Sequence, residues 1–151
     1  MSVQPQDPRA WIQNHIRLYQ TDPEKAHLFD FSFVGVKEPM PTLLLTTTGR
    51  KSGRPIPTPL IYSKAGDAFV VIGSKGGAPS HPDWYLNLVA TPACEIQVAR
   101  DHYLCVARTV TDEAERGPLW AQMAQLYPPY DDYQRSAGAR KIPVVVLDPQ
   151  G

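Results

Sequence analysis

Ring-bearing and aliphatic side chains recur at intervals of three and four residues near the start of the chain. They are Trp11, Ile12, His15, Ile16 and Tyr19. This spacing puts them on one face of a helix and predicts an amphipathic helix over residues 8–19. Only Arg9 and Arg17 are basic within it, so we expect its apolar face to pack on the protein's own core, with a membrane surface as the alternative. Residues 21–41 show little periodicity, and we expect a connecting arm there.

Six short segments beyond this arm are rich in β-branched and aliphatic residues. They are residues 42–47, 56–63, 68–73, 94–99, 102–110 and 142–147. Segments of this length and composition, bounded by glycine, proline and aspartate, predict strands. The short loops at residues 64–67 and 100–101 predict that the strands beside them form two antiparallel hairpins.

Helical patterns are inserted between the predicted hairpins. Pro82 is expected to open a helix that reaches Val89, and a second helix is expected after Val110, with a kink or restart at Pro118, which lacks an N–H group. Residues 130–135 predict a short last helix. Since helices do not follow every strand, the pattern excludes a doubly wound parallel sheet. It predicts a mainly β, α+β fold, a small and partly open barrel flanked by helices.

The chain has 151 residues, and its 15 Lys and Arg residues balance 15 Asp and Glu residues. This length suits one domain with its own core, so we expect a single domain over residues 1–151. Within it, residues 1–41 are expected to form the N-terminal helix and arm, and residues 42–149 the barrel. Because the net charge is zero, no overall field attracts nucleic acid, and we expect no nucleic-acid partner.

The chain shows no pattern of secretion or of a membrane span. Its longest aliphatic run, residues 144–147, is far shorter than the roughly 20 apolar residues that cross a bilayer. Residues 1–8 lack the basic start and apolar stretch of a secretory signal. We therefore expect a cytoplasmic protein, with attachment to the inner face of the membrane through the N-terminal helix as the alternative.

The two cysteines and four histidines form no metal-binding pattern. Neither C-x-x-C nor H-E-x-x-H occurs, so we expect no metal site. If residues 100–101 are a two-residue loop, Cys94 faces Ala107 and Cys105 faces Ile96. The thiols then occupy diagonal positions about 7 to 8 Å apart, beyond the reach of a disulfide, and we expect both to stay free.

Two glycine-containing loops have the composition of anion-binding sites. The first consists of Gly49, Arg50, Lys51, Ser52, Gly53 and Arg54. The second, which follows an apolar run, consists of Gly73, Ser74, Lys75, Gly76 and Gly77. Glycines let backbone N–H groups turn toward one point, and Arg and Lys add charge-assisted hydrogen bonds to phosphate or carboxylate. Neither loop matches a P-loop, so a solvated basic hairpin and a plain glycine turn stay open as alternatives.

Three tyrosines, Tyr127, Tyr130 and Tyr133, recur at intervals of three around a pair of prolines. In one interpretation they line the mouth of a pocket, and in the other they pack as core aromatics. The motifs G-x-S-x-G and G-x-G-x-x-G are absent, so the sequence indicates neither a serine nucleophile nor a nicotinamide-binding fingerprint.

Four motifs stand in order along residues 40–149. They are LLTTTGRKSG at 44–53, SKGG at 74–77 with HPDWYLNL at 81–88, YPPYDDYQ at 127–134, and IPVVVL at 142–147. Together they resemble the deazaflavin-dependent nitroreductase family, a branch of the split β-barrel flavin-binding superfamily. The resemblance implies a six-stranded, mostly antiparallel split β-barrel flanked by helices. It also implies coenzyme F420, an 8-hydroxy-5-deazaflavin with a phosphate and a polyglutamate tail, as the hydride donor.

The resemblance further implies roles for particular residues. The cofactor-binding residues are expected to be Gly49, Arg50, Lys51, Ser52, Arg54, Pro59, Ile61, Ser74, Lys75, Gly76, Gly77, Trp84 and Asn87. The substrate-binding residues are expected to be Tyr127, Tyr130 and Tyr133, and the catalytic hydrogen-bond donors Tyr130, Tyr133 and Ser74. A family tyrosine near the substrate falls at Ile61 or Tyr62, which leaves that contact open.

We therefore expect an F420-dependent oxidoreductase that transfers a hydride to a quinone-like, nitroaromatic or activated enone acceptor. No side chain transfers hydride, so the protein would orient the deazaflavin, exclude water and stabilise negative charge on the acceptor. FMN in the same barrel is the alternative cofactor. A carrier that binds F420 or a lipid without turnover is the non-enzymatic alternative, and the oligomeric state is left open between monomer and homodimer.

Overall fold

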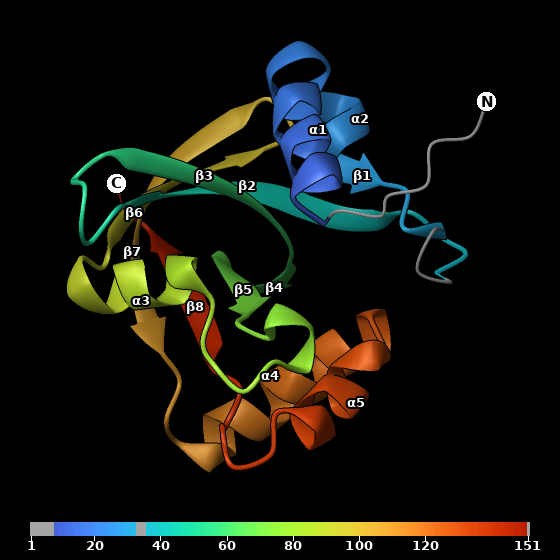
Figure 1. Ribbon diagram of the computed structural model, residues 1–151, viewed down its shortest axis with the longest axis vertical. Coiled ribbons are helices and arrows are strands. Elements are labelled where there is room, and N and C mark those ends of the chain that lie inside the picture. The colour runs from blue at the N-terminus through green and yellow to red at the C-terminus, as the bar shows by residue number, and fades with distance from the viewer. Residues whose placement is uncertain (1–7, 33–35, 151) are drawn as a thin grey trace.

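One antiparallel sheet curls into a partly open barrel (Figure 1). In the computed structural model, which describes residues 8–32 and 36–150, the strand order is β1-β2-β6-β7-β8-β5-β4, and β3 pairs with β2 outside this order. The strands are β1 (Leu28–Phe29), β2 (Met40–Thr48), β3 (Pro55–Ile61), β4 (Ser63–Ala65), β5 (Ala68–Ile72), β6 (Ala93–Val98), β7 (Asp101–Thr109) and β8 (Val144–Pro149). The expected α+β barrel is confirmed. The predicted strand 56–63 is divided, because β3 pairs with β2 and only β4 pairs with β5, so the hairpin predicted there is formed by β4 and turns at residues 66–67. The short strand β1 adds to the predicted ones.

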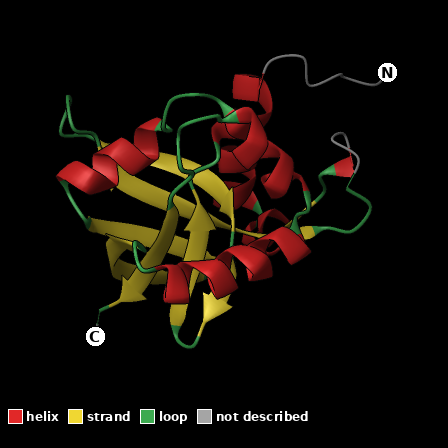
Figure 2. Ribbon diagram, turned by 90° about the horizontal axis from the view of Figure 1, so that it is seen from below, coloured by secondary structure: helices red, strands yellow, loops and turns green. Residues whose placement is uncertain are grey.

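The helices lie around the outside of the strands (Figure 2). They are α1 (Pro8–Thr21), α2 (Pro23–His27), α3 (Asp83–Ala90), α4 (Glu113–Leu126) and α5 (Pro129–Ser136). Helices α1, α3 and α5 lie where the sequence predicts them. Helix α4 is continuous across Pro118, where a kink or restart was expected. Because Gly117 and Pro118 are exposed, the proline ring can point into solvent, and the helix loses only one backbone hydrogen bond there.

Helix α2 occupies part of the arm in which we expected no regular structure. The Asp22 side chain accepts a hydrogen bond from the Lys25 backbone N–H at 3.3 Å, and Pro23 stands at the first helical position. These two residues are a typical helix start. The expectation was wrong because a helix of five residues is too short to show a hydrophobic period.

The hairpin between β6 and β7 turns one residue earlier than expected. Ala99 has a φ of +53°, and Val98 pairs with Asp101. Cys94 therefore lies directly opposite Cys105, not diagonal to it. The predicted register was wrong because alanine seldom adopts a left-handed backbone, and no turn residue marks the position. Both thiols are free and buried.

The two faces of the sheet are buried in separate apolar clusters. Strand β5 contributes to both, because successive side chains of a strand point to opposite faces, and all of its residues are buried. The barrel interior contains, among others, Leu43, Leu45, Phe69, Val71, Ile96 and, from α3, Trp84 and Leu88. The second cluster, between the sheet and helices α4 and α5, contains Val70, Ile72, Val144, Val146, Met123, Tyr127 and Tyr130.

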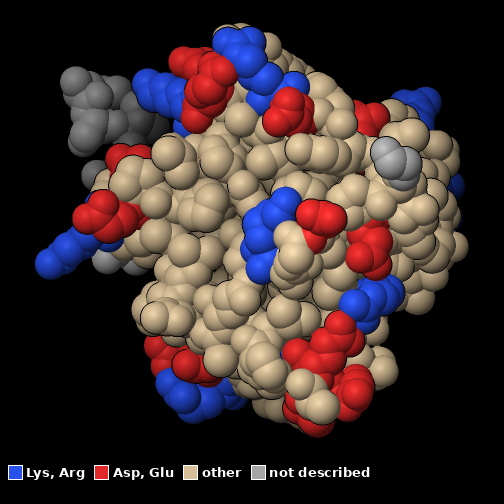
Figure 3. Space-filling view, turned by 180° about the vertical axis from the view of Figure 1, so that it is seen from behind, with Lys and Arg blue, Asp and Glu red and all other residues tan. Residues whose placement is uncertain are grey.

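The surface carries both signs of charge. On the face shown in Figure 3, Lys and Arg lie interspersed with Asp and Glu, as the zero net charge suggests. Within residues 8–32 and 36–150, no helix has the length and apolar character needed to cross a bilayer.

Two buried side chains fasten helix α1, Tyr19 to strand β2 and His15 to helix α2. The Tyr19 hydroxyl donates to the Thr42 carbonyl at 2.5 Å, and His15 Nε2 donates to the Ala26 carbonyl at 3.0 Å. The His15 ring stacks on Phe29 with ring centres 3.7 Å apart. In the described part of the chain, His15 Nδ1 is buried without a hydrogen-bond partner. The apolar face of α1 thus packs on the protein's own core, as the sequence predicts.

Burial makes this attachment sensitive to acid. It lowers the pKa of His15 to about 4, because a proton on Nδ1 would be buried without an acceptor. Between this value and the ordinary histidine pKa of about 6.5, the unfolded chain binds a proton that the folded protein does not. Acidification from pH 7 to pH 4 is therefore expected to remove up to about 3 kcal/mol of unfolding free energy, measured by urea unfolding across this range.

The variant His15→Gln isolates the contribution of His15. His27 and His81 also have lowered pKa values because of burial, so the wild-type slope contains more than one contribution. The variant His15→Gln should flatten the dependence of unfolding free energy on pH relative to the wild type. Equal slopes for His15→Gln and wild type would contradict the assignment to His15.

Candidate functional site

The first glycine-containing loop is a closed turn at the end of the β2–β3 hairpin. The Gly49 N–H donates to the Arg54 carbonyl at 2.8 Å, and the Gly53 N–H donates to the Gly49 carbonyl at 2.8 Å. Ser52 Oγ accepts from the Arg54 N–H at 3.2 Å. Gly53 has a φ of +72°, which glycine adopts without strain. The loop therefore has a defined shape before any ligand binds.

Arg50 joins this loop to helix α3. Its backbone N–H and its Nη1 both donate to Asn87 Oδ1, at 3.1 and 2.9 Å. Its Nη2 forms an ion pair with Asp83 at 3.1 Å. The buried Asn87 donates in turn to Thr47 Oγ1 at 3.2 Å. Two predicted cofactor-binding residues, Arg50 and Asn87, are thus bonded to each other, and the guanidinium already has a carboxylate partner.

Other predicted residues around this loop differ in exposure. Trp84, one turn from Asn87 on α3, is buried in the barrel interior. Lys51 and Arg54 are exposed, and neither forms an ion pair with any residue that the structure describes. The free cations of this loop are therefore those of Lys51 and Arg54.

The second loop, which we call the glycine turn (residues 73–78), packs against helix α5. Lys75, Gly76 and Gly77 form a short 3-10 helix, η2, which lies beside α5 in Figure 1. A Cβ atom on Gly77 would stand 2.8 Å from the Tyr133 carbonyl oxygen, so only glycine allows this approach. The turn is thereby brought next to the predicted tyrosines.

Arg140, which no sequence pattern predicts as a site residue, holds the glycine turn from the side of the core. Its guanidinium donates to the carbonyls of Gly73, Ser74 and Ala78 at 3.0, 2.6 and 2.8 Å. His81 Nδ1 lies 3.1 Å from its Nη1 and therefore accepts, which requires a neutral ring. No local motif marks Arg140; its position just before the final strand motif is the only signal in the sequence.

Burial divides the three tyrosines. Tyr130 is 5% exposed and lies within the second cluster, whereas Tyr133 is half-buried. The hydroxyl groups of Tyr127 and Tyr133 are 3.1 Å apart and share a hydrogen bond. Burial raises the pKa of Tyr127 and of Tyr130, so both hydroxyls keep their protons at neutral pH. Of the three, Tyr133 has the most accessible side chain for a ligand.

Strand β3 presents an edge of hydrogen-bond acceptors. The Tyr62 N–H donates to the Pro41 carbonyl and the Gly49 N–H to the Arg54 carbonyl, so the even-numbered residues of β3 bond to β2. The odd-numbered residues face the other edge, and three of them are Pro55, Pro57 and Pro59. Since proline has no N–H, this stretch offers carbonyls and no donor, and it resists pairing with another strand.

The same strand connects the two groups of predicted residues. It begins directly after Arg54 and ends at Ile61, which packs against the second cluster together with Tyr133. Its seven residues span about 20 Å. The first loop therefore lies at the start of β3, and the end of β3 packs against the cluster that contains the tyrosines, with Pro59 between the two ends.

A cavity of about 460 Å³ opens beside the first loop. It is lined by Thr46, Thr48 and Gly53 together with the exposed Leu104 and Val106. The glycine turn does not contribute to its lining. The two loops are linked instead through the segment 78–87, which accepts hydrogen bonds from Arg140 at Ala78 and from Arg50 at Asn87.

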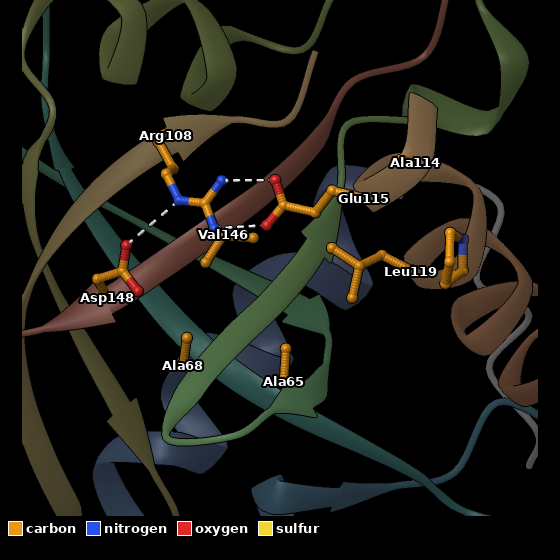
Figure 4. Close-up of a pocket in the computed structure, with 9 residues that line it drawn as sticks. Ala65, Ala68, Arg108, Ala114, Glu115, Leu119, Val146 and Asp148 are labelled. Atoms are coloured by element: carbon orange, nitrogen blue, oxygen red, sulfur yellow. Dashed lines mark hydrogen bonds and ion pairs between the residues drawn. The ribbon is translucent and has the colours of Figure 1, made fainter. Parts of the chain in front are cut away.

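A second cavity, of about 380 Å³, lies between α4 and strands β5 and β8. Its floor includes Ala68 and Val146, and Arg108 stands at its rim between Glu115 and Asp148 (Figure 4). These carboxylates balance the charge of the guanidinium. None of the predicted site residues lines this cavity.

Comparison with known proteins gives a consistent family. The model of the family described as F420H(2)-dependent quinone reductase matches residues 9–149. A protein of Mycobacterium tuberculosis (strain H37Rv) named F420H(2)-dependent quinone reductase is 41% identical over 112 residues, which cover 71% of this chain and 72% of that protein.

Two solved structures are also similar. One, described as an F420-H2 dependent reductase (FDR-A), is 36% identical with a TM-score of 0.65 and covers 71% of this chain and 93% of its own. The other, described as a domain-swapped dimer, is 32% identical with a TM-score of 0.68 and covers 94% of this chain and 100% of its own. Both agree with the split-barrel fold.

The close approach of the glycine turn to α5 predicts unequal effects of two substitutions. Gly76 and Gly77 both have positive φ, but only a Cβ on Gly77 meets other atoms, at 2.8 and 2.9 Å from Tyr133. Gly76→Ala is expected to cost about 1 kcal/mol of unfolding free energy through backbone strain. Gly77→Ala should cost about 2 to 4 kcal/mol because overpacking adds to it. Urea unfolding measures both, and equal losses would contradict the contact.

Proposed function

Because the chain belongs to the F420H(2)-dependent quinone reductase family, we propose that it transfers a hydride from reduced F420 to a quinone-like acceptor. The observation that carries the proposal is the arrangement along β3. Free cations, Lys51 and Arg54, lie at one end of the strand, and the hydrogen-bonded hydroxyls of Tyr127 and Tyr133 belong to the cluster at its other end. An arrangement with cations at one end of a strand and hydroxyl groups near the other suits an elongated ligand that has an anionic tail and a reactive ring.

The residues present fit an anionic cofactor. Lys51 and Arg54 are exposed on a loop whose shape is already closed by backbone hydrogen bonds, so little ordering cost remains on binding. Charge-assisted hydrogen bonds to phosphate or carboxylate are the strong class of such contacts. The single phosphate of FMN would bind the same loop, so FMN is titrated in parallel with F420.

Bound in reduced form, F420 supplies the hydride. The protein's own residues position the cofactor-binding loops and stabilise negative charge on the acceptor. Arg50 and Asn87 hold the first loop against α3, and Gly77 seats the glycine turn on α5. As negative charge grows on the acceptor oxygen, the Tyr133 hydroxyl donates a hydrogen bond to it. Tyr127, whose pKa is raised by burial, keeps its proton and orients Tyr133.

Ser74 and Tyr130 take supporting positions in this proposal. The half-buried Ser74 directly precedes η2 in the glycine turn and offers its hydroxyl as a second donor. Tyr130 packs edge-on to Tyr127, with ring centres 4.9 Å apart, and so fixes the aromatic wall. Nitroaromatic and activated enone acceptors fit the same scheme, because each carries an oxygen that becomes more negative on reduction.

Removing the free cations should weaken cofactor binding. Two charge-assisted hydrogen bonds contribute on the order of 3 kcal/mol, so the double variant Lys51→Ala, Arg54→Ala is expected to bind F420 about a hundredfold more weakly. Fluorescence titration of F420 measures the affinity, with FMN titrated in parallel.

The control for this variant is Lys25→Ala, which removes an exposed cation from α2 and should leave F420 affinity unchanged. Arg50→Ala should lower the unfolding temperature as well as the affinity, because it detaches the loop from α3. Wild-type protein that binds FMN but not F420 would contradict the proposed function.

Tyr133 is expected to act on the acceptor rather than on the cofactor. Tyr133→Phe removes the hydroxyl and keeps the ring, so quinone reduction should slow by about tenfold, while F420 affinity stays within experimental error. Steady-state kinetics and the titration together measure this separation.

Tyr85→Phe is the matched control, since the Tyr85 hydroxyl bonds to Thr109. It should change neither the rate nor the affinity. A loss of F420 affinity in Tyr133→Phe, with the rate at saturating cofactor preserved, would place Tyr133 on the cofactor side.

A further inference from the structure

The two cysteines lie directly opposite each other on β6 and β7. Cys94 pairs with Cys105, so both side chains point to the same face of the sheet, and both belong to the cluster in the barrel interior. Burial raises the pKa of Cys94 to about 12, and the neighbouring Cys105 adds to this increase. The two thiols are thus close enough to interact, and neither takes part in the proposed hydride transfer.

The type of pairing sets the distance between the two backbones. The Ala107 N–H donates to the Pro92 carbonyl at 2.9 Å, and in an antiparallel ladder hydrogen-bonded pairs recur at every second residue. Cys94 and Cys105 are therefore a hydrogen-bonded pair, whose Cα atoms are about 5.5 Å apart. Disulfides span Cα distances of about 4.4 to 6.8 Å. The folded backbone thus already holds the two residues at bridging distance.

The spacing of the Cβ atoms is less favourable than that of the Cα atoms. Directly opposite residues have Cβ atoms about 4.5 to 5.5 Å apart, whereas a disulfide brings them to about 3.5 to 4.5 Å. The two strands must draw slightly closer to form the bond, and a disulfide that is strained in this way is reduced more readily. This geometry favours a bond that forms and opens over a permanent one.

The cavity beside the first loop gives access to this pair. Both cysteines contribute to the lining of its volume of about 460 Å³. Cys94 is 9% exposed and Cys105 is 2% exposed, so a small molecule meets Cys94 first. The thiolate is the reactive form, and burial also raises the pKa of Cys105, to about 11. Oxidation at neutral pH is therefore slow and needs an oxidant small enough to enter the cavity.

We propose that Cys94 and Cys105 form a reversible disulfide when the folded protein meets hydrogen peroxide. The Cys94 thiolate attacks one peroxide oxygen, the O–O bond breaks, and the departing hydroxide takes up the thiol proton to form water. The product is a sulfenic acid. The Cys105 sulfur attacks it, so that the S–S bond forms, the S–O bond breaks, and a second water leaves with the Cys105 proton. The two thiols lose two electrons and two hydrogens, and peroxide becomes two waters.

Counting the thiols measures this bond directly. The folded protein is treated with hydrogen peroxide, then unfolded in urea with iodoacetamide and weighed by mass spectrometry. The wild type is expected to lose two hydrogens and to take up no alkyl group, and dithiothreitol added before unfolding should restore two alkylated cysteines. Trypsin cleaves after Arg100, which lies between the two cysteines, so the disulfide is detected as two joined peptides.

A matched variant moves one thiol to a diagonal position. The double variant Cys105→Ala, Ala107→Cys keeps two thiols on the interior face, but position 107 is diagonal to Cys94, about 7 to 8 Å away and beyond disulfide reach. In the folded state it should form the disulfide at least about tenfold more slowly than the wild type. In urea, where no strand register exists, both proteins should form it at similar rates.

The rate of disulfide formation should also follow the pKa of the buried thiols. Below the pKa, the thiolate fraction rises about tenfold with each pH unit. Because burial raises both pKa values in the folded protein, the folded wild type should react about a hundredfold faster at pH 9 than at pH 7. In urea the rise should level off near the ordinary cysteine pKa of about 8.5.

Four results would overturn the proposal. Two are an unchanged thiol count in the folded wild type after peroxide, and oxidation of one cysteine to sulfinic acid while the other is alkylated. The third is a rate in the folded wild type that levels off near pH 8.5, since the reaction would then pass through unfolded chains. The fourth is an equal rate for the folded wild type and the diagonal variant. The first three need only the wild type, so they decide the question even if the variant does not fold.

Discussion

The segment between β5 and α3 is held at both ends by guanidinium groups, and the candidate site depends on that restraint. At one end, Arg140 donates hydrogen bonds to three carbonyls of the glycine turn. At the other end, Arg50 forms an ion pair with Asp83 and a hydrogen bond with Asn87, both on α3. A guanidinium group is planar and has several N–H donors, so it can fix the orientation of several peptide units at once. An ammonium group cannot do this. Both arginines therefore have partners inside the protein, whereas Lys51 and Arg54 of the first loop form no ion pair within the described residues.

Strand β3 differs in chemistry from this restrained segment. Along Pro55, Pro57 and Pro59 its outer edge offers carbonyls and no N–H, whereas the N–H groups of Ser74, Lys75 and Gly76 have no acceptor among the described residues. An edge of prolines resists strand addition, so the barrel stays open along it. Donors and acceptors on separate elements can orient a ligand that carries both an anion and N–H or O–H groups, because each end of the ligand matches only one element.

Much of the fold and part of the site could be predicted from the sequence. The β-branched runs predicted six of the strands, whereas anion binding by the two loops stays a prediction from their composition. The sequence predicts the same role for all three tyrosines, because their spacing does not show which of them faces the core. In the structure Tyr130 is in the core and Tyr133 is half-buried, a difference that only the packing of α5 on the second cluster produces.

By itself, the sequence determined most of the elements, the barrel class and the residue types available for chemistry, because propensity and hydrophobic period are local properties of the chain. The tertiary structure alone decided which partners those residues take. Arg140 meets Gly73 across 67 positions of sequence, Cys94 faces Cys105 because Ala99 turns left-handed, and Arg50 is bound to α3 before any ligand arrives. Hydrogen-bond partners and burial depend on which distant segments pack together, and no local pattern contains that information.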